Sequence, residues 1–203
     1  MNSLRLALVF GFALLTVQTP PAPARAAGET AAVVTDFGSR TLQMLNDPQL
    51  SQAERQARFG ALLDQDFDLV KTGRFVLGRY WRTATDQDKQ EFARVFHDYV
   101  VQIYSVRFGQ FTGASFNVMG ERQEGPGSTL VSTTVTQREN PTPAKVDWRV
   151  STGTGSPRIT DVIVDGVSMS LTYRQEFASV IEQVGGVSGL IAQLRAKTNA
   201  TKQ

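Results

Sequence analysis

The sequence predicts an α+β fold: helices in the first part of the chain, a four-stranded antiparallel sheet after Gly113, and helices again at the end. Two observations support this prediction. Apolar residues recur with a period near 3.6 up to about residue 111, which is typical of helices, and with a period near 2 from residue 115, which is typical of strands. The expected strands follow one another through short Gly- and Pro-containing connections, which favour antiparallel pairing.

The N-terminal segment has the pattern of a secretory signal peptide. Arg5 precedes an apolar run at Leu6–Val17, and a proline-rich segment then leads to the A-x-A arrangement at residues 24–26 that a signal peptidase recognises. The apolar run has only about a dozen residues, whereas a helix that spans a bilayer needs about 20. We therefore expect residues 1–26 to be cleaved and residues 27–203 to form a single exported domain.

Charge and composition exclude several classes of function. Residues 1–26 contain two arginines and no acidic residue, so their removal turns the balance of 21 basic and 19 acidic side chains into an even one. An even balance gives no support to a nucleic-acid partner, because such binding requires a basic surface. The chain has no cysteine and a single histidine, which excludes disulfides, thiolate zinc sites and His-rich metal sites. We expect no metal and no cofactor.

Two helices are predicted in the first third of the domain. An apolar stripe at Val33–Leu45 has helical spacing and ends before Pro48. Ser51 with Glu54 is a capping box, in which each side chain bonds the backbone N–H of the other residue, and it opens the second helix.

A longer helix is predicted from a second capping box, Thr85 with Asp88. Val101 and Phe108 lie on the side opposite its main apolar stripe, so this helix should be covered on more than one face or should help to line a cavity. The stripe itself is expected to hold Phe92, Val95, Phe96, Tyr99, Ile103 and Val106.

The strand-rich part begins with a hairpin that turns at Gly125-Pro126-Gly127. One face of its second strand holds Val131, Thr133 and Val135. The four predicted strands are residues 115–123, 129–138, 146–150 and 158–165.

A turn at Asp165-Gly166, with positive φ at the glycine, should return Val167 and Met169 to the core and leave Ser168 pointing away. Thr172, with Gln175, is then expected to cap an amphipathic helix that ends at Gly185-Gly186. A short helix with Leu190, Ile191 and Leu194 follows.

The inventory for catalysis is small. A serine triad would need His97 as its base, and the neighbouring Asp98 is expected to point about 100° away around the helix and so not to orient the imidazole. We therefore expect a partly exposed, non-catalytic histidine. One basic and one acidic cluster precede the long helix, and they either pair locally or are solvated helix ends; they consist of Lys71, Arg74, Arg79 and Arg82, and of Asp64, Asp66 and Asp68.

Several segments follow one another along the chain: FVLGRYWRTAT at 75–85, the aromatic positions 92, 96, 99 and 104, DVIVDGVSM at 161–169, RQEF at 174–177, and Gly186 with GLIAQL at 189–194. In this order they resemble the MlaC, or toluene-tolerance, family of periplasmic lipid-binding proteins. The resemblance covers nearly all of residues 27–203. A hopanoid-associated branch of the family is similar too, and Arg107-Phe108 with Phe111-Thr112-Gly113 favours it, so both branches remain open.

The resemblance implies a strongly curved sheet, akin to the nuclear-transport-factor-2-like cone, closed by helices around an elongated apolar pocket. Such proteins hold the acyl chains of a phospholipid or related lipid and ferry it between an outer-membrane lipoprotein and porin complex and an inner-membrane ABC transporter complex. No bond is made or broken. The residues expected to line the pocket are Phe75, Phe96, Tyr99, Ile103, Val131, Val146, Trp148, Ile163, Val167, Met169 and Phe177.

Two alternatives remain open. An enzyme acting on an apolar substrate inside the same cone would use Asp161 or Asp98 as base with Tyr99 or Tyr104 as donor. An adaptor would bind membrane proteins and no lipid. Analysis of lipid extracted from the purified protein separates a carrier, which should be loaded, from both.

Overall fold

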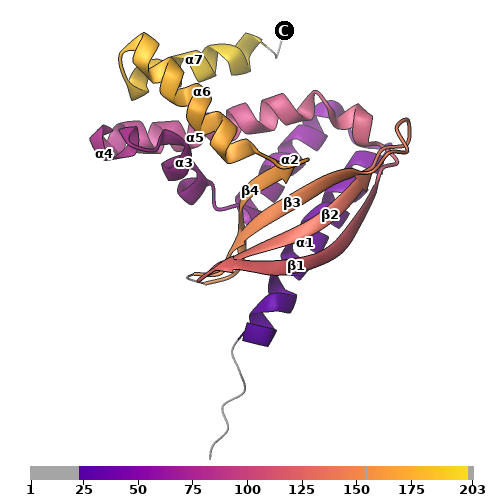
Figure 1. Cartoon of the computed structure of the whole chain (residues 1–203). Coiled ribbons are helices and arrows are strands. Elements are labelled where there is room, and N and C mark those ends of the chain that lie inside the picture. The colour runs from indigo at the N-terminus through magenta and orange to yellow at the C-terminus, as the bar shows by residue number, and fades with distance from the viewer. Residues whose placement is uncertain (1–22, 154, 201–203) are drawn as a thin grey trace, which may run out of the picture.

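The computed structural model describes residues 23–153 and 155–200 (Figure 1). Most of the predicted signal peptide, residues 1–26, therefore lies outside the described residues, and residues 23–26 form the first turn of helix α1, Pro23–Asn46. The other helices are α2 Gln52–Asp66, α3 Leu69–Leu77, α4 Tyr80–Thr83, α5 Asp86–Ser105, the 3-10 helix η1 Phe108–Phe111, α6 Met169–Val184 and α7 Val187–Ala200.

No single helix of the described residues is long and apolar enough to span a membrane. Helices α6 and α7 reach that length and hydropathy only together, across a bend of 111°.

The sheet is antiparallel and has five strands in sequential order. The predicted four are present, and a fifth of two residues was not predicted. It forms because the turn at Asp165-Gly166 folds the chain back, so that Ser168 pairs with Ile163. The strands are β1 Ser115–Gly125, β2 Ser128–Thr136, β3 Ala144–Ser151, β4 Arg158–Val164 and β5 Val167–Ser168.

The sheet is curved, and α1 crosses one of its faces (Figure 1). Register shifts between Val118 and Gly120 and between Arg149 and Val150 mark irregularities of the kind that bend and twist strands. Helix α5 packs against α2, α3 and α7, so it is covered on several sides as predicted.

Both predicted capping boxes are confirmed: Ser51 with Glu54 opens α2, and Thr85 with Asp88 opens α5. The predicted start of α6 was wrong. Ser168, not Thr172, is the N-cap. Ser168 can cap the helix because the β5 pairing has already turned the chain at residue 168, so the helix begins directly after the strand. The predicted end is confirmed, since Gly185 closes α6 in the left-handed conformation with φ 78°.

Most of the apolar stripe predicted for α5 is buried and forms part of an aromatic core. Rings of Phe92, Phe96 and Tyr99 contact Phe177 of α6 with centroid distances of 5.9–6.4 Å. Val101 and Phe108 are buried as expected, whereas Val106 is 53% exposed, which contradicts the prediction. Val106 is the C-cap, one residue beyond the end of the helix at Ser105.

Of the two alternatives for the charged clusters, local pairing is not seen among the described residues. Asp66 accepts two hydrogen bonds, of 2.8 and 2.7 Å, from Arg40 of α1, and burial raises the pKa of Asp66 although Arg40 opposes this shift. Arg79 pairs with Glu182 of α6. These partners are distant in sequence, so local spacing could not predict them.

Candidate functional site

A cavity of about 520 Å³ lies between the sheet and the helices. Its wall is formed by α1, α2, α3, α5 and η1, by β1 to β4, and by the first turns of α6. Gly38 of α1 brings this helix against the sheet, because a Cβ there would lie 2.6 Å from the ring of Phe116. Most wall residues are apolar, among them Phe37, Leu45, Leu63, Phe108, Phe116 and Trp148.

The structure places Phe96, Val146, Trp148 and Met169 in this wall. Trp148 is fixed there by a hydrogen bond of 2.9 Å from Nε1 to Oγ1 of Thr133. The other predicted residues lie elsewhere. Tyr99, Val131, Ile163 and Phe177 are buried outside the wall, Ile103 is half-buried outside it, and Phe75 and Val167 are exposed.

The helical period explains the misplacement on α5. Its contribution to the wall is Phe96, Val100 and Tyr104, spaced four residues apart. Tyr99 lies about 100° from Val100 around the helix and contacts Tyr173 and Phe177 of α6 instead. Residues of this one apolar stripe therefore face either α6 or the cavity. The spacing of apolar residues in the sequence does not show which residue faces which.

Two further predicted placements were wrong at the start of α6. Val167 is 54% exposed rather than in the core, and Ser168 does not point away, because it bonds Asp161. Phe75 is exposed on the outer side of α3, where the guanidinium of Arg174 lies 5.0 Å from the ring centroid.

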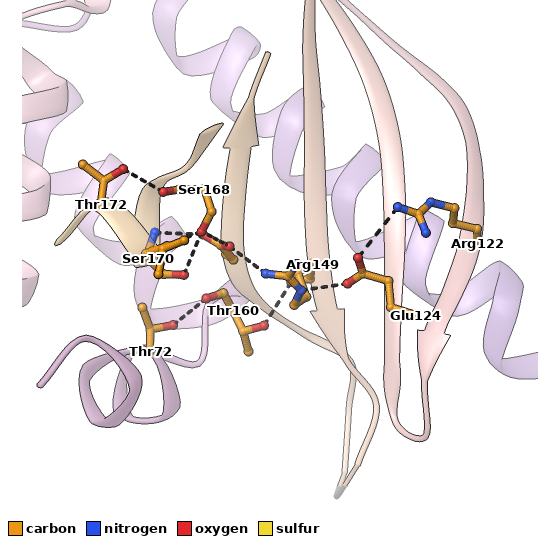
Figure 2. Close-up of polar contacts among 10 residues, drawn as sticks. Thr72, Arg122, Glu124, Arg149, Thr160, Ser168, Ser170 and Thr172 are labelled. Carbon is orange, nitrogen blue, oxygen red and sulfur yellow. Dashed lines mark hydrogen bonds and ion pairs between the residues drawn. The ribbon is translucent and has the colours of Figure 1, made fainter. Parts of the chain in front are cut away.

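Asp161 is a charged wall residue whose side chain is only 2% exposed. Its carboxylate accepts hydrogen bonds from Arg149 Nη1 at 2.7 Å, Ser168 Oγ at 2.6 Å and Ser170 N at 2.9 Å (Figure 2). Hydrogen bonding to Glu124, which Figure 2 also draws, raises the pKa of Arg149. The carboxylate therefore holds the first turn of α6 on the sheet, and both of its oxygens are occupied, which disfavours a role as catalytic base.

The other candidate base lies outside the wall. Asp98 bonds His97, with 3.0 Å between Oδ1 and Nδ1, contrary to the expectation that these neighbours would not meet. The two side chains bend toward each other on the open flank of α5, so their 100° separation does not keep them apart. Nε2 of His97 lies 3.4 Å from the carbonyl oxygen of Gly60.

The phenols of Tyr99 and Tyr173 keep their protons at neutral pH. Burial raises the pKa of Tyr173, and the neighbouring Tyr104 adds to this shift. Burial likewise raises the pKa of Tyr99, one of the donors considered for an enzyme, which lies outside the wall. These rings therefore contribute neutral, largely apolar surface.

A second hollow, of about 470 Å³, lies at the junction of α2 and α3. Asp64, Asp68 and Arg158 contribute to its wall, and the guanidinium of Arg158 donates to the carbonyl oxygens of Asp64 and Phe67. Polar and charged residues make up a larger share of its wall than of the wall of the larger cavity.

The family model described as MlaC protein matches residues 36–196. The chain belongs to the MlaC family. A solved structure of a phospholipid-binding protein from Ralstonia solanacearum, in complex with a phospholipid, shares the fold with a TM-score of 0.75 at 24% sequence identity. The match covers 86% of this chain and 99% of the other.

In this MlaC-family chain, sequence reasoning missed most of the wall. The helix-facing aromatic residues Phe37, Phe59 and Phe111 carried a usable signal, since each is an apolar position on a predicted helix or at its end. Thr41 and Arg107 also belong to the wall. Nothing local distinguishes them from surface residues, because only the packing of η1 and α1 brings them to the cavity.

Proposed function

We propose that this protein is a carrier of phospholipid or a related lipid and not an enzyme. The observation that carries the proposal is the cavity of about 520 Å³ with its largely apolar wall. Exposing an acyl chain of about sixteen carbons to water costs on the order of 12 kcal/mol, at about 0.8 kcal/mol per CH₂, so a carrier must enclose it. Family membership and the phospholipid complex of the Ralstonia protein support the same function.

The test is extraction and mass spectrometry of lipids from protein purified out of cells without added lipid. A carrier should yield phospholipid in stoichiometric amounts. A hopanoid in its place would assign the chain to the hopanoid-associated branch. Protein that is consistently empty would overturn the proposal and favour an adaptor or an enzyme.

We also propose that the protein is exported and works in the periplasm, between an outer-membrane lipoprotein and porin complex and an inner-membrane ABC transporter complex. The signal-peptide pattern of residues 1–26 and the family support this. The even charge of residues 27–203 suits release from both partners, since a strongly charged carrier would be held by one of them.

Two measurements test these finer statements. The intact mass of protein from a periplasmic extract should correspond to residues 27–203, and a mass that includes residues 1–26 contradicts cleavage. Purified protein should also move a fluorescent phospholipid from donor to acceptor membranes that contain the two complexes, and should lose this activity when either complex is left out.

A further inference from the structure

The polar side chains of the cavity wall fall into two groups. The side chains of the first group form hydrogen bonds within the protein. The hydroxyl of Thr72 donates to the carbonyl oxygen of Thr160, and the hydroxyl of Thr160 donates to the carbonyl oxygen of Arg149. The carboxylate of Asp161 accepts from three donors. These groups serve the fold.

The second group is Thr41 and Arg107. The hydroxyl of Thr41 is buried and has no hydrogen-bond partner among the described residues. The guanidinium of Arg107 makes no ion pair or side-chain hydrogen bond with any residue that the structure describes. A buried hydroxyl without a partner costs free energy, so a ligand that supplies an acceptor would recover it.

Arg107 is the one basic residue among the described wall residues, and it is also the one that is exposed. It directly follows α5 and precedes η1, whose Phe108 and Phe111 are also in the wall. An exposed side chain in the wall of a cavity marks the place where the cavity meets solvent. The end of α1 is held near this place, because Asn46 Oδ1 accepts a hydrogen bond of 2.7 Å from Gly113 N.

We infer that Arg107 binds the phosphate group of the carried lipid and that Thr41, in the same wall, donates to an ester oxygen of that lipid. This inference rests on the proposed carrier function and names the ligand chemistry that the site selects. Guanidinium and phosphate form charge-assisted hydrogen bonds, which are roughly twice as strong as neutral ones. The acyl chains then extend from Arg107 into the cavity, and the protein prefers phosphate-bearing lipids to uncharged lipids of the same chain length.

The experiment loads delipidated protein from vesicles that contain equal amounts of phosphatidylglycerol and diacylglycerol with identical chains, and measures the ratio of bound lipids by mass spectrometry. Arg107→Gln should lower the ratio of phosphatidylglycerol to diacylglycerol by at least about tenfold, the low end of the range for a lost hydrogen bond to a charged group. Arg107→Lys should retain part of the preference. Arg82→Gln is the matched control, since Arg82 is exposed and outside the wall, and it should leave the ratio unchanged.

Thr41→Val removes the unpartnered hydroxyl at nearly constant shape. It should lower the amount of bound phosphatidylglycerol by about two- to threefold without lowering the melting temperature, because no internal hydrogen bond is lost. An Arg107→Gln protein that binds the two lipids in the wild-type ratio overturns the inference while the carrier function stands. Wild-type protein that takes up neither lipid overturns the carrier function and the inference with it.

Discussion

The hydroxyl of Ser168 donates a hydrogen bond of 2.6 Å to Oδ2 of Asp161 and accepts one of 3.1 Å from Leu171 N. One side chain thus caps α6 and joins it to β4. Because Met169, Ser170 and Tyr173 of α6 are in the cavity wall, this contact positions that part of the wall.

Ser168→Ala should lower the free energy of unfolding by about 1–2 kcal/mol, since it removes the cap of α6 and one donor to Asp161. Thr172→Ala is the matched control, because its hydroxyl only donates to the carbonyl oxygen of Ser168, and it should cost less than half as much. Urea unfolding measures both. Equal losses of unfolding free energy in the two variants would contradict Ser168 as the N-cap and favour Thr172.

Asp161→Asn should destabilise the fold by about 3 kcal/mol, because it leaves Arg149 facing a neutral group at a buried position. Glu124→Gln removes the other carboxylate partner of Arg149. The side chain of Glu124 is 23% exposed, so solvent screens this ion pair and its loss should destabilise the fold less. The order of the two variants in urea unfolding tests whether burial sets the strength of this network.

Stability should fall as the pH rises above about 10, where the unfolded-state tyrosine ionises. Burial raises the folded-state pKa of Tyr173, so the folded protein keeps its proton while the unfolded chain releases one, and unfolding becomes easier at alkaline pH. Tyr173→Phe should make this alkaline decline shallower. Thermal melts between about pH 8 and 11, on either side of that ionisation, measure the effect, and identical slopes for both proteins would contradict it.

Leu42→Asp should empty the cavity. Leu42 is a half-buried wall residue of α1, and an unpaired carboxylate there opposes acyl chains. Ile103→Asp, at a half-buried position outside the wall, is the control for the cost of the charge to the fold. Lipid extracted from each folded variant should be strongly reduced for Leu42→Asp and near normal for Ile103→Asp.

Gly166→Ala should lower the stability by about 1–2 kcal/mol, since Gly166 has φ 86° and an L side chain is disfavoured there. Beyond its two neighbours in the chain, no atom lies within 4 Å of the position that a Cβ would take, so the cost comes from the backbone conformation. Gly125→Ala, also in open space but without positive φ, should be close to neutral. Similar melting temperatures for both variants would show that residues 165–166 are not held in this turn.

The sequence by itself determined the longer helices and the four longer strands of this fold. Capping boxes at Ser51 and Thr85, the change from helical to strand period after Gly113, and the stop at Gly185 all depend on interactions within a few residues. Such interactions can be read from spacing. The family could be recognised for the same reason, because the ordered segments are local patterns.

Only the tertiary structure decided the cavity and the charge pairing. Whether an apolar residue of α5 faces α6, as Tyr99 does, or the cavity, as Val100 does, depends on where the sheet and α6 stand around that helix. Asp66 and Arg40 lie 26 residues apart in sequence, and the fold alone brings them together. Amphipathic spacing reports that a residue is removed from water, but burial against protein and burial against an empty cavity give the same pattern, so the wall appears only when the layers are packed.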